Sequence, residues 1–281
     1  MLPSRHLNSH KGTYGTVIVI GGSPLMIGAP AFTATAALRI GAGLVKIMTQ
    51  PNLILPILSL QPSATAIPLP TNIKRDLISR IPYTQKPKTV LALGPGLSIS
   101  DAAIQTVQQI IAQPNYHVVL DADGLNILAQ LAPSPNQIKA TLTLTPHPGE
   151  FQRLAAAYSL TYEKEQTDPA SSIACATQLA RLLNATIVLK SHATLIVNPD
   201  QHAINGTGNP ALATAGSGDV LTGIIAGLIA QGLSPFHAAQ LGTHLHGLAA
   251  DLWASIHGTA GLLASELTDH IPPVMQTYRK Q

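Results

Sequence analysis

The sequence contains a single cysteine, Cys175, so the chain cannot form an internal disulfide and cannot build a thiolate zinc site. Charged residues are also scarce, at 10% of the 281 residues, whereas 46% are hydrophobic. This balance excludes intrinsic disorder, which requires low hydrophobicity and high net charge, and it is not typical of a coiled coil. A chain of this length and composition can bury most of its apolar surface in a folded core.

Long hydrophobic runs are absent as well. The longest nearly apolar stretch is Val220–Leu233, and it is shorter than the about 20 apolar residues that a membrane-spanning helix needs. We therefore expect a buried helix there and no membrane partner. The first eleven residues include Arg5, His6 and Lys11 and contain no apolar segment, so we expect no signal peptide. A cytoplasmic enzyme is the simplest setting for such a chain.

Acidic residues are absent from the chain before Asp76, although its net charge at pH 7 is only +3. The basic residues that precede Asp76 are Arg5, Lys11, Arg39, Lys46, Lys74 and Arg75. They are dispersed rather than clustered in a stripe, so no nucleic-acid partner is expected. We interpret the basic N-terminal part as mild support for binding an anionic dinucleotide.

Short β-branched runs alternate with longer helical stretches along the chain. The predicted strands are residues 16–20, 44–49, 89–93, 117–120, 141–145 and 186–189, and residues 194–197 and 202–205 are expected to pair as a hairpin or meander. The predicted helices are residues 31–40, 101–112, 170–183, 220–229 and 235–256, with Pro272-Pro273 ending the last helix. This alternation predicts an α/β fold with a mostly parallel central sheet. No linker or repeat divides the chain, which predicts one domain over residues 1–281.

Four Gly- and Pro-rich turns follow predicted strands, at residues 21–24, 94–96, 121–124 and 146–149. In open α/β sheets, ligands bind outside the carboxyl ends of the strands. The four turns are therefore predicted to contribute to one site. Asp121 and Asp123 belong either to this site or to the cap of the following helix.

The segment Thr214–Leu221 opens the apolar helix with the residues Thr-Ala-Gly-Ser-Gly-Asp-Val-Leu. Glycine amides and the positive end of the helix dipole predict an anion site there. A carboxylate repels a phosphate, so Asp219 fits best as a base toward a hydroxyl or as a metal-associated group. The alternative is that the dipole alone favours an acidic residue in the first turn.

Other common nucleotide motifs are missing. The sequence has no Gly-x-x-x-x-Gly-Lys-Ser/Thr element and no Gly-x-Gly-x-x-Gly after its first strand, which excludes a P-loop protein and argues against the usual dinucleotide fold. His244 and His246 are two residues apart on a predicted helix, so they point to different faces. We interpret them as structural or interfacial rather than metal-binding.

Three elements carry a family resemblance: His10-Lys11-Gly12-Thr13-Tyr14-Gly15, Thr145-Pro146-His147-Pro148-Gly149-Glu150 and Ala215-Gly216-Ser217-Gly218-Asp219. The third is typical of the whole ribokinase-like superfamily, whereas the first two are much more specific. Taken together, the motifs resemble the ADP/ATP-dependent NAD(P)H-hydrate dehydratase family of that superfamily. The resemblance implies a three-layer αβα sandwich. It also implies that ADP or ATP phosphorylates the ring hydroxyl of the S form of hydrated NADH or NADPH. Phosphate elimination then restores the cofactor, with Mg²⁺ neutralising the nucleotide phosphates.

The resemblance also implies residue roles. Asp219 is the expected catalytic base. The expected substrate-binding residues are Ala29, Gly96, Asn126, His147 and Asp219. The expected nucleotide-binding residues are Lys190, Ser191, His192, Ala193, Thr194, Gly216, Ser217 and Gly218. Glu150 is a candidate for Mg²⁺ or substrate positioning, as is Asn209.

One position departs from the family pattern, because Ser191 stands where the family usually has glycine. Serine adopts positive φ much less readily than glycine, so the backbone of this loop can differ from that of the family. The preference for ADP or ATP is therefore left open. The alternative to a binding role is a purely structural turn for His147 and a solvated strand end for Lys190. The implied partners are a separate NAD(P)H-hydrate epimerase and further copies of the chain in a homotetramer. The alternative functions are a small-molecule kinase of the hydroxyethylthiazole or pyridoxal kinase type and a nucleotide-binding protein without turnover.

Overall fold

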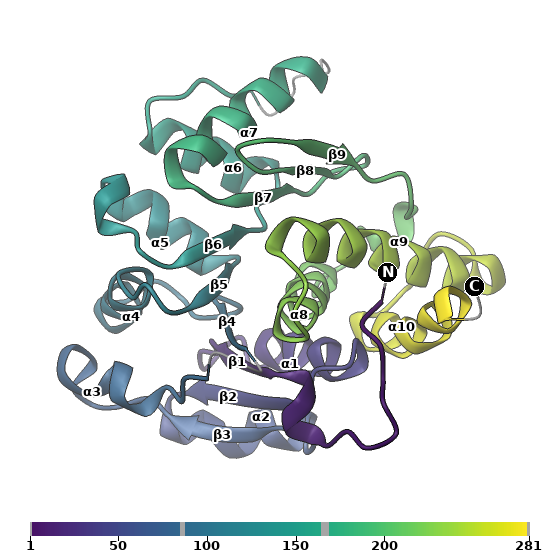
Figure 1. The fold of residues 1–281 in the computed structure, drawn as a ribbon, viewed down its shortest axis with the longest axis horizontal. Coiled ribbons are helices and arrows are strands. Elements are labelled where there is room, and N and C mark those ends of the chain that lie inside the picture. The colour runs from purple at the N-terminus through teal and green to yellow at the C-terminus, as the bar shows by residue number, and fades with distance from the viewer. Residues whose placement is uncertain (1, 85–87, 164–168, 280–281) are drawn as a thin grey trace.

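The computed structural model describes residues 2–84, 88–163 and 169–279, which form a layered arrangement of helices and strands (Figure 1). The strands are β1 Thr16–Ile20, β2 Leu44–Thr49, β3 Thr65–Pro68, β4 Thr89–Leu93, β5 His117–Leu120, β6 Thr141–Leu144, β7 Thr186–Leu189, β8 Leu195–Val197 and β9 His202–Ile204. The α-helices are α1 Gly28–Arg39, α2 Ile54–Leu60, α3 Ile73–Arg80, α4 Asp101–Ile111, α5 Asp123–Leu131, α6 Pro148–Ala157, α7 Pro169–Leu183, α8 Ser217–Ala230, α9 Pro235–His257 and α10 Ala264–Arg279. Short 3₁₀ turns lie at Lys11–Tyr14, Pro51–Leu53, Pro135–Gln137 and Pro210–Leu212.

The strands form one sheet in the order β3-β2-β1-β4-β5-β6-β7-β8-β9 within the described residues. Neighbours are parallel from β3 through β7, whereas β7–β8 and β8–β9 are antiparallel. In the centre, Val17 of β1 lies opposite Val45 of β2 and Val90 of β4. The predicted mostly parallel sheet and the terminal hairpin are confirmed.

Helices cover both faces of the sheet, which confirms the expected three-layer αβα sandwich (Figure 1). Successive β1 side chains alternate between two cores: Val17 and Val19 pack with α1, α8, α9 and α10, while Ile18 and Ile20 pack on the other face with α4 and α5. In a parallel sheet that helices cover on both faces, side chains on both sides of each strand are buried, so polar residues are disfavoured. This explains why the central strands are continuously apolar.

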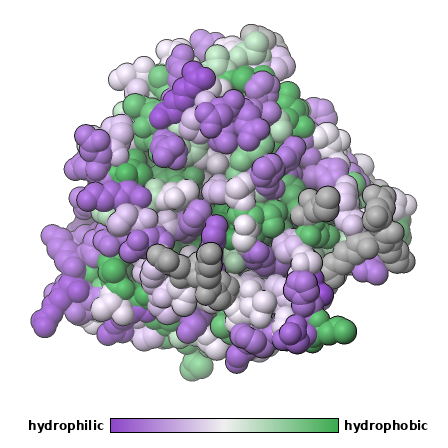
Figure 2. All heavy atoms as spheres, viewed as in Figure 1, coloured by the Kyte–Doolittle hydropathy of each residue, from purple (hydrophilic) through white to green (hydrophobic). Residues whose placement is uncertain are grey.

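Helix α8 is the buried helix expected at residues 220–233, and every residue from Val220 to Ala230 is buried. It packs closely on α1: a Cβ added at Gly223 would lie 2.2 Å from the carbonyl oxygen of Thr33. In the described residues, no helix is both long and apolar enough to cross a membrane. On the face shown in Figure 2, hydrophobic residues form small separate groups among hydrophilic ones.

The prediction that Pro272-Pro273 ends the last helix is wrong. Helix α10 runs through both prolines to Arg279. Leu267, Ile271 and Met275, spaced four residues apart, are buried on one side of this helix in the core shared with α9. Burial of this stripe outweighs the loss of backbone hydrogen bonds at the prolines.

Sequence reasoning also missed β3, α2, α3, α5 and α6. Strand β3 is partly exposed, and its residues show no clear alternation of buried and exposed positions.

The turn between β5 and α5 holds an alanine in an unfavourable conformation. Ala122 has φ 49° and ψ −121°, a region that residues with a Cβ rarely adopt. This turn separates Asp121, whose side chain enters the core, from Asp123, whose Oδ2 accepts a hydrogen bond from the Ser98 amide at 2.7 Å. The strained turn therefore positions two carboxylates in different directions.

We predict that Ala122→Gly stabilises the protein by about 1 kcal/mol, because the strain of about 1–3 kcal/mol exceeds the entropic cost of glycine. Thermal unfolding should show a higher midpoint for this variant. The matched control is Ala174→Gly at an exposed position of α7, which should lower stability by about 0.5–1 kcal/mol. A lower midpoint for Ala122→Gly would contradict the prediction.

Candidate active site

The four predicted turns lie at one edge of the sheet, because β1, β4, β5 and β6 are adjacent parallel strands. The amide of Gly22 donates a hydrogen bond to the Pro95 carbonyl at 3.0 Å, joining the first two turns. The Asp121 amide donates to the Leu93 carbonyl at 3.1 Å, which joins the turn after β5 to the end of β4. The turns therefore lie together at one edge, and their contribution to one ligand site stays a prediction.

A cavity of about 720 Å³ opens beside this edge. Its wall contains eight of the residues proposed from the sequence, namely His147, Lys190, Ser191, His192, Thr194, Asn209, Ser217 and Gly218. The remainder of the wall comes from the segment 205–213 and from α8 and α9: Asn205, Thr207, Gly208, Pro210, Leu212, Ala213, Leu221, Thr243, His246 and Gly247. Ala193 and Gly216 are neighbours of lining residues but are not themselves in this wall.

Four predicted substrate residues, Ala29, Gly96, Asn126 and Asp219, lie outside the wall of this cavity. A Cβ added at Gly96 would lie 3.3 Å from the Cβ of Ala29, so these two residues face each other across the ends of β4 and α1. The Oδ1 of Asn126 accepts a hydrogen bond from Nε of Arg153 at 3.0 Å. Asn126 therefore has an intramolecular partner.

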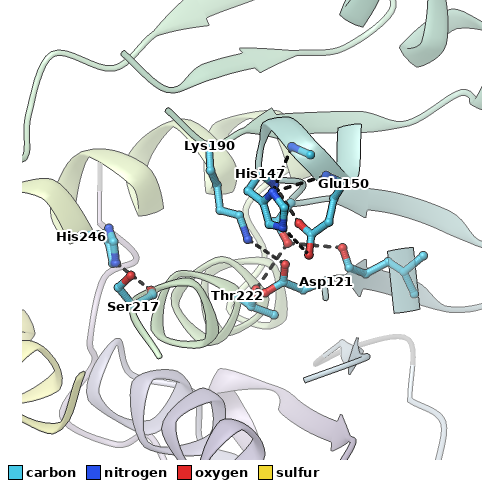
Figure 3. Close-up of polar contacts among 10 residues, drawn as sticks. Asp121, His147, Glu150, Lys190, Ser217, Thr222 and His246 are labelled. Carbon is cyan, nitrogen blue, oxygen red and sulfur yellow. Dashed lines mark hydrogen bonds and ion pairs between the residues drawn. The ribbon is translucent and has the colours of Figure 1, made fainter. Parts of the chain in front are cut away.

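A buried ion pair connects the ends of β5 and β7 (Figure 3). Nζ of Lys190 lies 2.9 Å from Oδ1 of Asp121, and the Asp121 side chain is only 3% exposed. The Thr222 hydroxyl of α8 donates to Oδ2 of Asp121 at 2.7 Å. Asp121 is thus an ion-pair partner and not a helix cap, and Lys190 is not a solvated strand end.

The charge on Lys190 is maintained by its neighbours. Burial alone would lower the pKa of Lys190. The nearby carboxylates of Asp121 and Glu150 raise this pKa by more than burial lowers it, so the pKa lies above its usual value. The ammonium is also close to the start of α8, since a Cβ at Gly218 would lie 3.2 Å from Nζ. Lys190 and the first amides of α8 can therefore bind the same anion.

His147 and Glu150 form a capping box at the start of α6 (Figure 3). Nδ1 of His147 accepts from the amides of Gly149 at 3.1 Å and Glu150 at 3.4 Å, while Oε2 of Glu150 accepts from the His147 amide at 2.8 Å. Because Nδ1 is an acceptor, the ring proton resides on Nε2, 3.3 Å from Oε1 of Glu150. His147 is both a structural cap and a lining residue, and its Nδ1 is not available as a base.

Asp219 lies in the first turn of α8 and is half-buried. The helix starts at Ser217, three residues earlier than expected, after Gly216 with φ 88°. A side chain at Gly216 would be strained there and would meet the Cβ of Ala264 at 2.8 Å, which explains the glycine. Burial and the nearby charge of Asp121 raise the pKa of Asp219 to about 7, although Lys190 opposes them. A carboxylate with this pKa is suited to accept a proton near neutral pH.

Glu150 belongs to the same group of charges. Burial raises the pKa of the Glu150 carboxyl, with Asp121 adding to the rise and Lys190 opposing it. Its side chain is 7% exposed, and both oxygens face His147. Among the described residues, no cluster of three or more His, Cys, Asp or Glu side chains is arranged to hold a metal ion.

The segment 205–213, which forms one side of the cavity, depends on a residue that sequence reasoning missed. Asp251 of α9 accepts from the Gly208 amide at 2.9 Å and from Nδ2 of Asn209 at 2.8 Å. Asn209 in turn accepts from the Ala211 amide through Oδ1 at 2.9 Å. The available signal was that Asp251 is the one acidic residue of α9.

The serine at position 191 causes no strain in this structure. Ser191 is not among the described non-glycine residues with positive φ. Its amide donates to Oγ1 of Thr194 at 3.3 Å, and the Thr194 hydroxyl donates to the Ser191 carbonyl at 3.0 Å. The loop is closed by these hydrogen bonds without a glycine.

Two further expectations concern the basic residues and the histidines. None of the six basic residues before Asp76 belongs to the cavity wall, and one of them, Arg39, pairs with Asp269 at 2.5 Å instead. His244 bonds the Tyr278 hydroxyl, whereas His246 lines the cavity, so the two rings face different surroundings as expected.

A family model described as NAD(P)H-hydrate dehydratase matches residues 17–273. The chain belongs to the NAD(P)H-hydrate dehydratase family. An ADP-dependent (S)-NAD(P)H-hydrate dehydratase from Neisseria meningitidis is 38% identical, covering 99% of this chain and 89% of the relative. A bifunctional NAD(P)H-hydrate repair enzyme from Moorella thermoacetica is 40% identical, covering 100% of this chain and 53% of the relative. The chain thus spans about half the length of the bifunctional relatives that it matches.

A solved structure supports the same assignment. The ADP/ATP-dependent NAD(P)H-hydrate dehydratase from Bacillus subtilis, co-crystallised with ATP and Mg²⁺, superposes with a TM-score of 0.82 at 34% identity. The alignment covers 99% of this chain and 94% of the Bacillus chain. The ribokinase-like fold implied by the motifs is therefore confirmed.

We predict that the stability difference between Asp219→Asn and the unmodified protein depends on pH. The pKa of Asp219 rises from 3.8 in the unfolded chain to about 7 in the folded chain, so only the folded state holds this proton between those values. The contribution of Asp219 to stability therefore falls as pH rises from about 4 to 7. Asp219→Asn should gain stability relative to the unmodified protein across this window, measured by urea unfolding at pH 5, 6, 7 and 8.

The control is Asp200→Asn, at an exposed position in the turn between β8 and β9. Its stability difference is measured at the same pH values as the reference for a surface carboxylate. A constant difference for Asp219→Asn over the same range would contradict the raised pKa.

We predict that Lys190→Met lowers the free energy of unfolding by about 3–5 kcal/mol, because it leaves the buried Asp121 carboxylate without its cation. The double variant Asp121→Asn/Lys190→Met removes both charges and should recover a large part of this loss. Urea unfolding of the two variants gives the comparison. Equal stability of the single and double variants would show that the ion pair carries no such penalty.

Proposed function

We propose that this chain uses ADP or ATP to dehydrate the S form of hydrated NADH or NADPH and so restores the reduced cofactor. The observation that carries the proposal is the position of Asp219. It lies in the first turn of α8, directly after Gly218, which lines the cavity together with Lys190. The names of the Neisseria and Bacillus relatives supply the substrate and the nucleotide.

In the first step, Asp219 accepts the proton of the substrate ring hydroxyl as its oxygen attacks the terminal phosphorus of the nucleotide. The phosphoanhydride bond breaks, so ADP leaves as AMP or ATP leaves as ADP. The amides at the start of α8 and the ammonium of Lys190 stabilise charge that develops on the transferred phosphoryl group. A pKa near 7 keeps a large fraction of Asp219 ionised and ready to accept the proton.

In the second step, the carbon–oxygen bond to the new phosphate breaks. The lone pair of the ring nitrogen supplies electrons toward the departing phosphate, and a neighbouring carbon loses a proton. The products are NADH or NADPH and inorganic phosphate. Phosphorylation is necessary because hydroxide is a poor leaving group and phosphate is a good one.

Magnesium fits this site as a companion of the nucleotide rather than as a resident of a protein cage. Both oxygens of Asp121 have partners, and those of Glu150 face His147. Mg²⁺ is commonly held by one or two carboxylates together with substrate phosphates and water. Glu150 or Asp219 would supply such a carboxylate, and the ion would neutralise phosphate charge when bound.

The remaining residue roles follow the same scheme. The nucleotide would contact Lys190, Ser191, His192, Ala193 and Thr194 as well as Gly216, Ser217 and Gly218. The hydrated nicotinamide would contact Ala29, Gly96, Asn126 and His147. The contact between Ala29 and Gly96 places two of these residues together. Binding the substrate at Asn126 would require it to share or release Arg153.

The wider setting is also part of the proposal. ADP is the favoured nucleotide, because the Neisseria relative is named ADP-dependent. The bifunctional relatives join two repair activities, which supports an NAD(P)H-hydrate epimerase as a partner in the same process. A cytoplasmic location and a homotetramer complete the proposal.

We predict that the purified protein restores NADH from its S hydrate in the presence of Mg²⁺ and ADP, as measured by near-ultraviolet absorbance. Asp219→Asn should lower the rate by about 10²- to 10⁴-fold, the usual contribution of a general base, while nucleotide affinity is largely retained. Asp200→Asn should leave the rate unchanged. No recovery of NADH with either ADP or ATP would refute the function, and a stable phosphorylated product would instead indicate a kinase.

A further inference from the structure

His246 occupies a position in the cavity wall to which no role has yet been assigned. It lies on α9, is 7% exposed, and lines the same cavity as Lys190 and Gly218. Its ring is directed at the first residue of α8, where Nε2 lies 3.0 Å from the Ser217 carbonyl oxygen (Figure 3). The imidazole is therefore next to the helix start that would bind the nucleotide phosphates.

The hydrogen bond to Ser217 determines the state of the ring. A carbonyl oxygen can only accept, so the proton resides on Nε2 and Nδ1 carries a free lone pair. Burial lowers the pKa of His246 to about 4, with the Ser217 carbonyl opposing this and the charge of Lys190 adding to it. The ring is therefore neutral at physiological pH, and Nδ1 is a constant hydrogen-bond acceptor.

Nδ1 of His246 has no hydrogen-bond partner in the part of the chain that the structure describes. Nδ1 of His246 is also not fully buried. In that part of the chain, the fully buried side-chain nitrogen and oxygen atoms without a partner are Oγ1 of Thr49 and Nδ1 of His117, so an unpartnered Nδ1 of His246 must be accessible. Because the residue is nearly buried and lines the cavity, the open side of Nδ1 faces the cavity. An acceptor in such a place gains a hydrogen bond only from a ligand or from water.

The chemistry of an acceptor limits what it can bind. Phosphate oxygens of a nucleotide are acceptors themselves, and the donors suited to them are Lys190 and the α8 amides. A neutral acceptor near the same helix start suits an O–H or N–H group of the nucleoside part. We propose that Nδ1 of His246 accepts a hydrogen bond from a ribose hydroxyl or the exocyclic amine of the nucleotide, which makes His246 a specificity-determining residue.

This inference rests on the proposed nucleotide site, and its test uses the full chain and four nucleotides. Affinities are measured by calorimetry for ADP, 2′-deoxy-ADP, 3′-deoxy-ADP and inosine diphosphate. The unmodified protein should bind one of the three analogues about 3- to 10-fold more weakly than ADP, as expected for one neutral hydrogen bond. The analogue that loses affinity identifies the donor.

Two variants separate the nitrogens of the ring. His246→Gln retains an N–H that can reach the Ser217 carbonyl but places no acceptor at Nδ1, so it should bind ADP and that analogue equally. His246→Asn places an oxygen near the position of Nδ1 and loses the contact with Ser217, so it should retain the preference for ADP. Thermal unfolding without nucleotide checks that both variants fold.

Equal affinity of the unmodified protein for all four nucleotides would overturn the inference, even if neither variant folds. An undiminished preference for ADP in folded His246→Gln would overturn it as well. Absence of ADP binding to the unmodified protein is a different result, because it would refute the proposed nucleotide site on which this inference rests.

Discussion

The ion pair between Asp121 and Lys190 is the interaction on which the rest of the site depends. It joins the carboxyl ends of β5 and β7, and the Thr222 hydroxyl extends the connection to α8. A buried charge is costly unless it is paired and hydrogen-bonded, so these three side chains are tightly constrained. Their arrangement brings a cation to the start of α8 and keeps two further carboxylates, Glu150 and Asp219, within reach of its charge.

The same constraint explains how one fold produces carboxylates with different properties. Asp121 lies against the ammonium of Lys190 and accepts a hydrogen bond from the Thr222 hydroxyl. Asp219 lies in the first turn of α8. There, burial and the charge of Asp121 outweigh the attraction of Lys190 and raise the pKa of Asp219 to about 7. A carboxyl whose pKa lies near neutral pH is suited to accept a proton, whereas the Asp121 carboxylate is occupied by the ion pair and the hydroxyl.

The sequence was sufficient for most of the sheet and for the general location of the site. The central strands are short and rich in β-branched residues, and β1, β2, β4, β5 and β7 have the predicted bounds. Once such strands are parallel, their carboxyl ends must share one edge, which brings the turns together. These conclusions depend on local pattern alone.

Features that depend on long-range contacts could not be derived in this way. Neither Thr222 nor Asp251 belongs to a recognisable motif, and each acts through a partner more than 40 positions away in the chain. Helix α10 continues through two prolines because its buried stripe is stabilised by α9, which local propensity cannot reveal. The pairing of His246 with Ser217 likewise appears only when α8 and α9 are packed together.

The charges around the cavity finally impose a requirement on its ligand. Lys190 is the only lysine or arginine among the described residues of the wall, and Asp121 already shares its charge. A nucleotide polyphosphate adds several negative charges beside Asp219, which would raise the pKa of this carboxyl further and hinder its ionisation. A base must be ionised to accept a proton, so under the proposed function we expect the nucleotide to arrive with cations of its own. This expectation follows from the shortage of basic residues in the wall, the same scarcity of charge that marks the sequence as a whole.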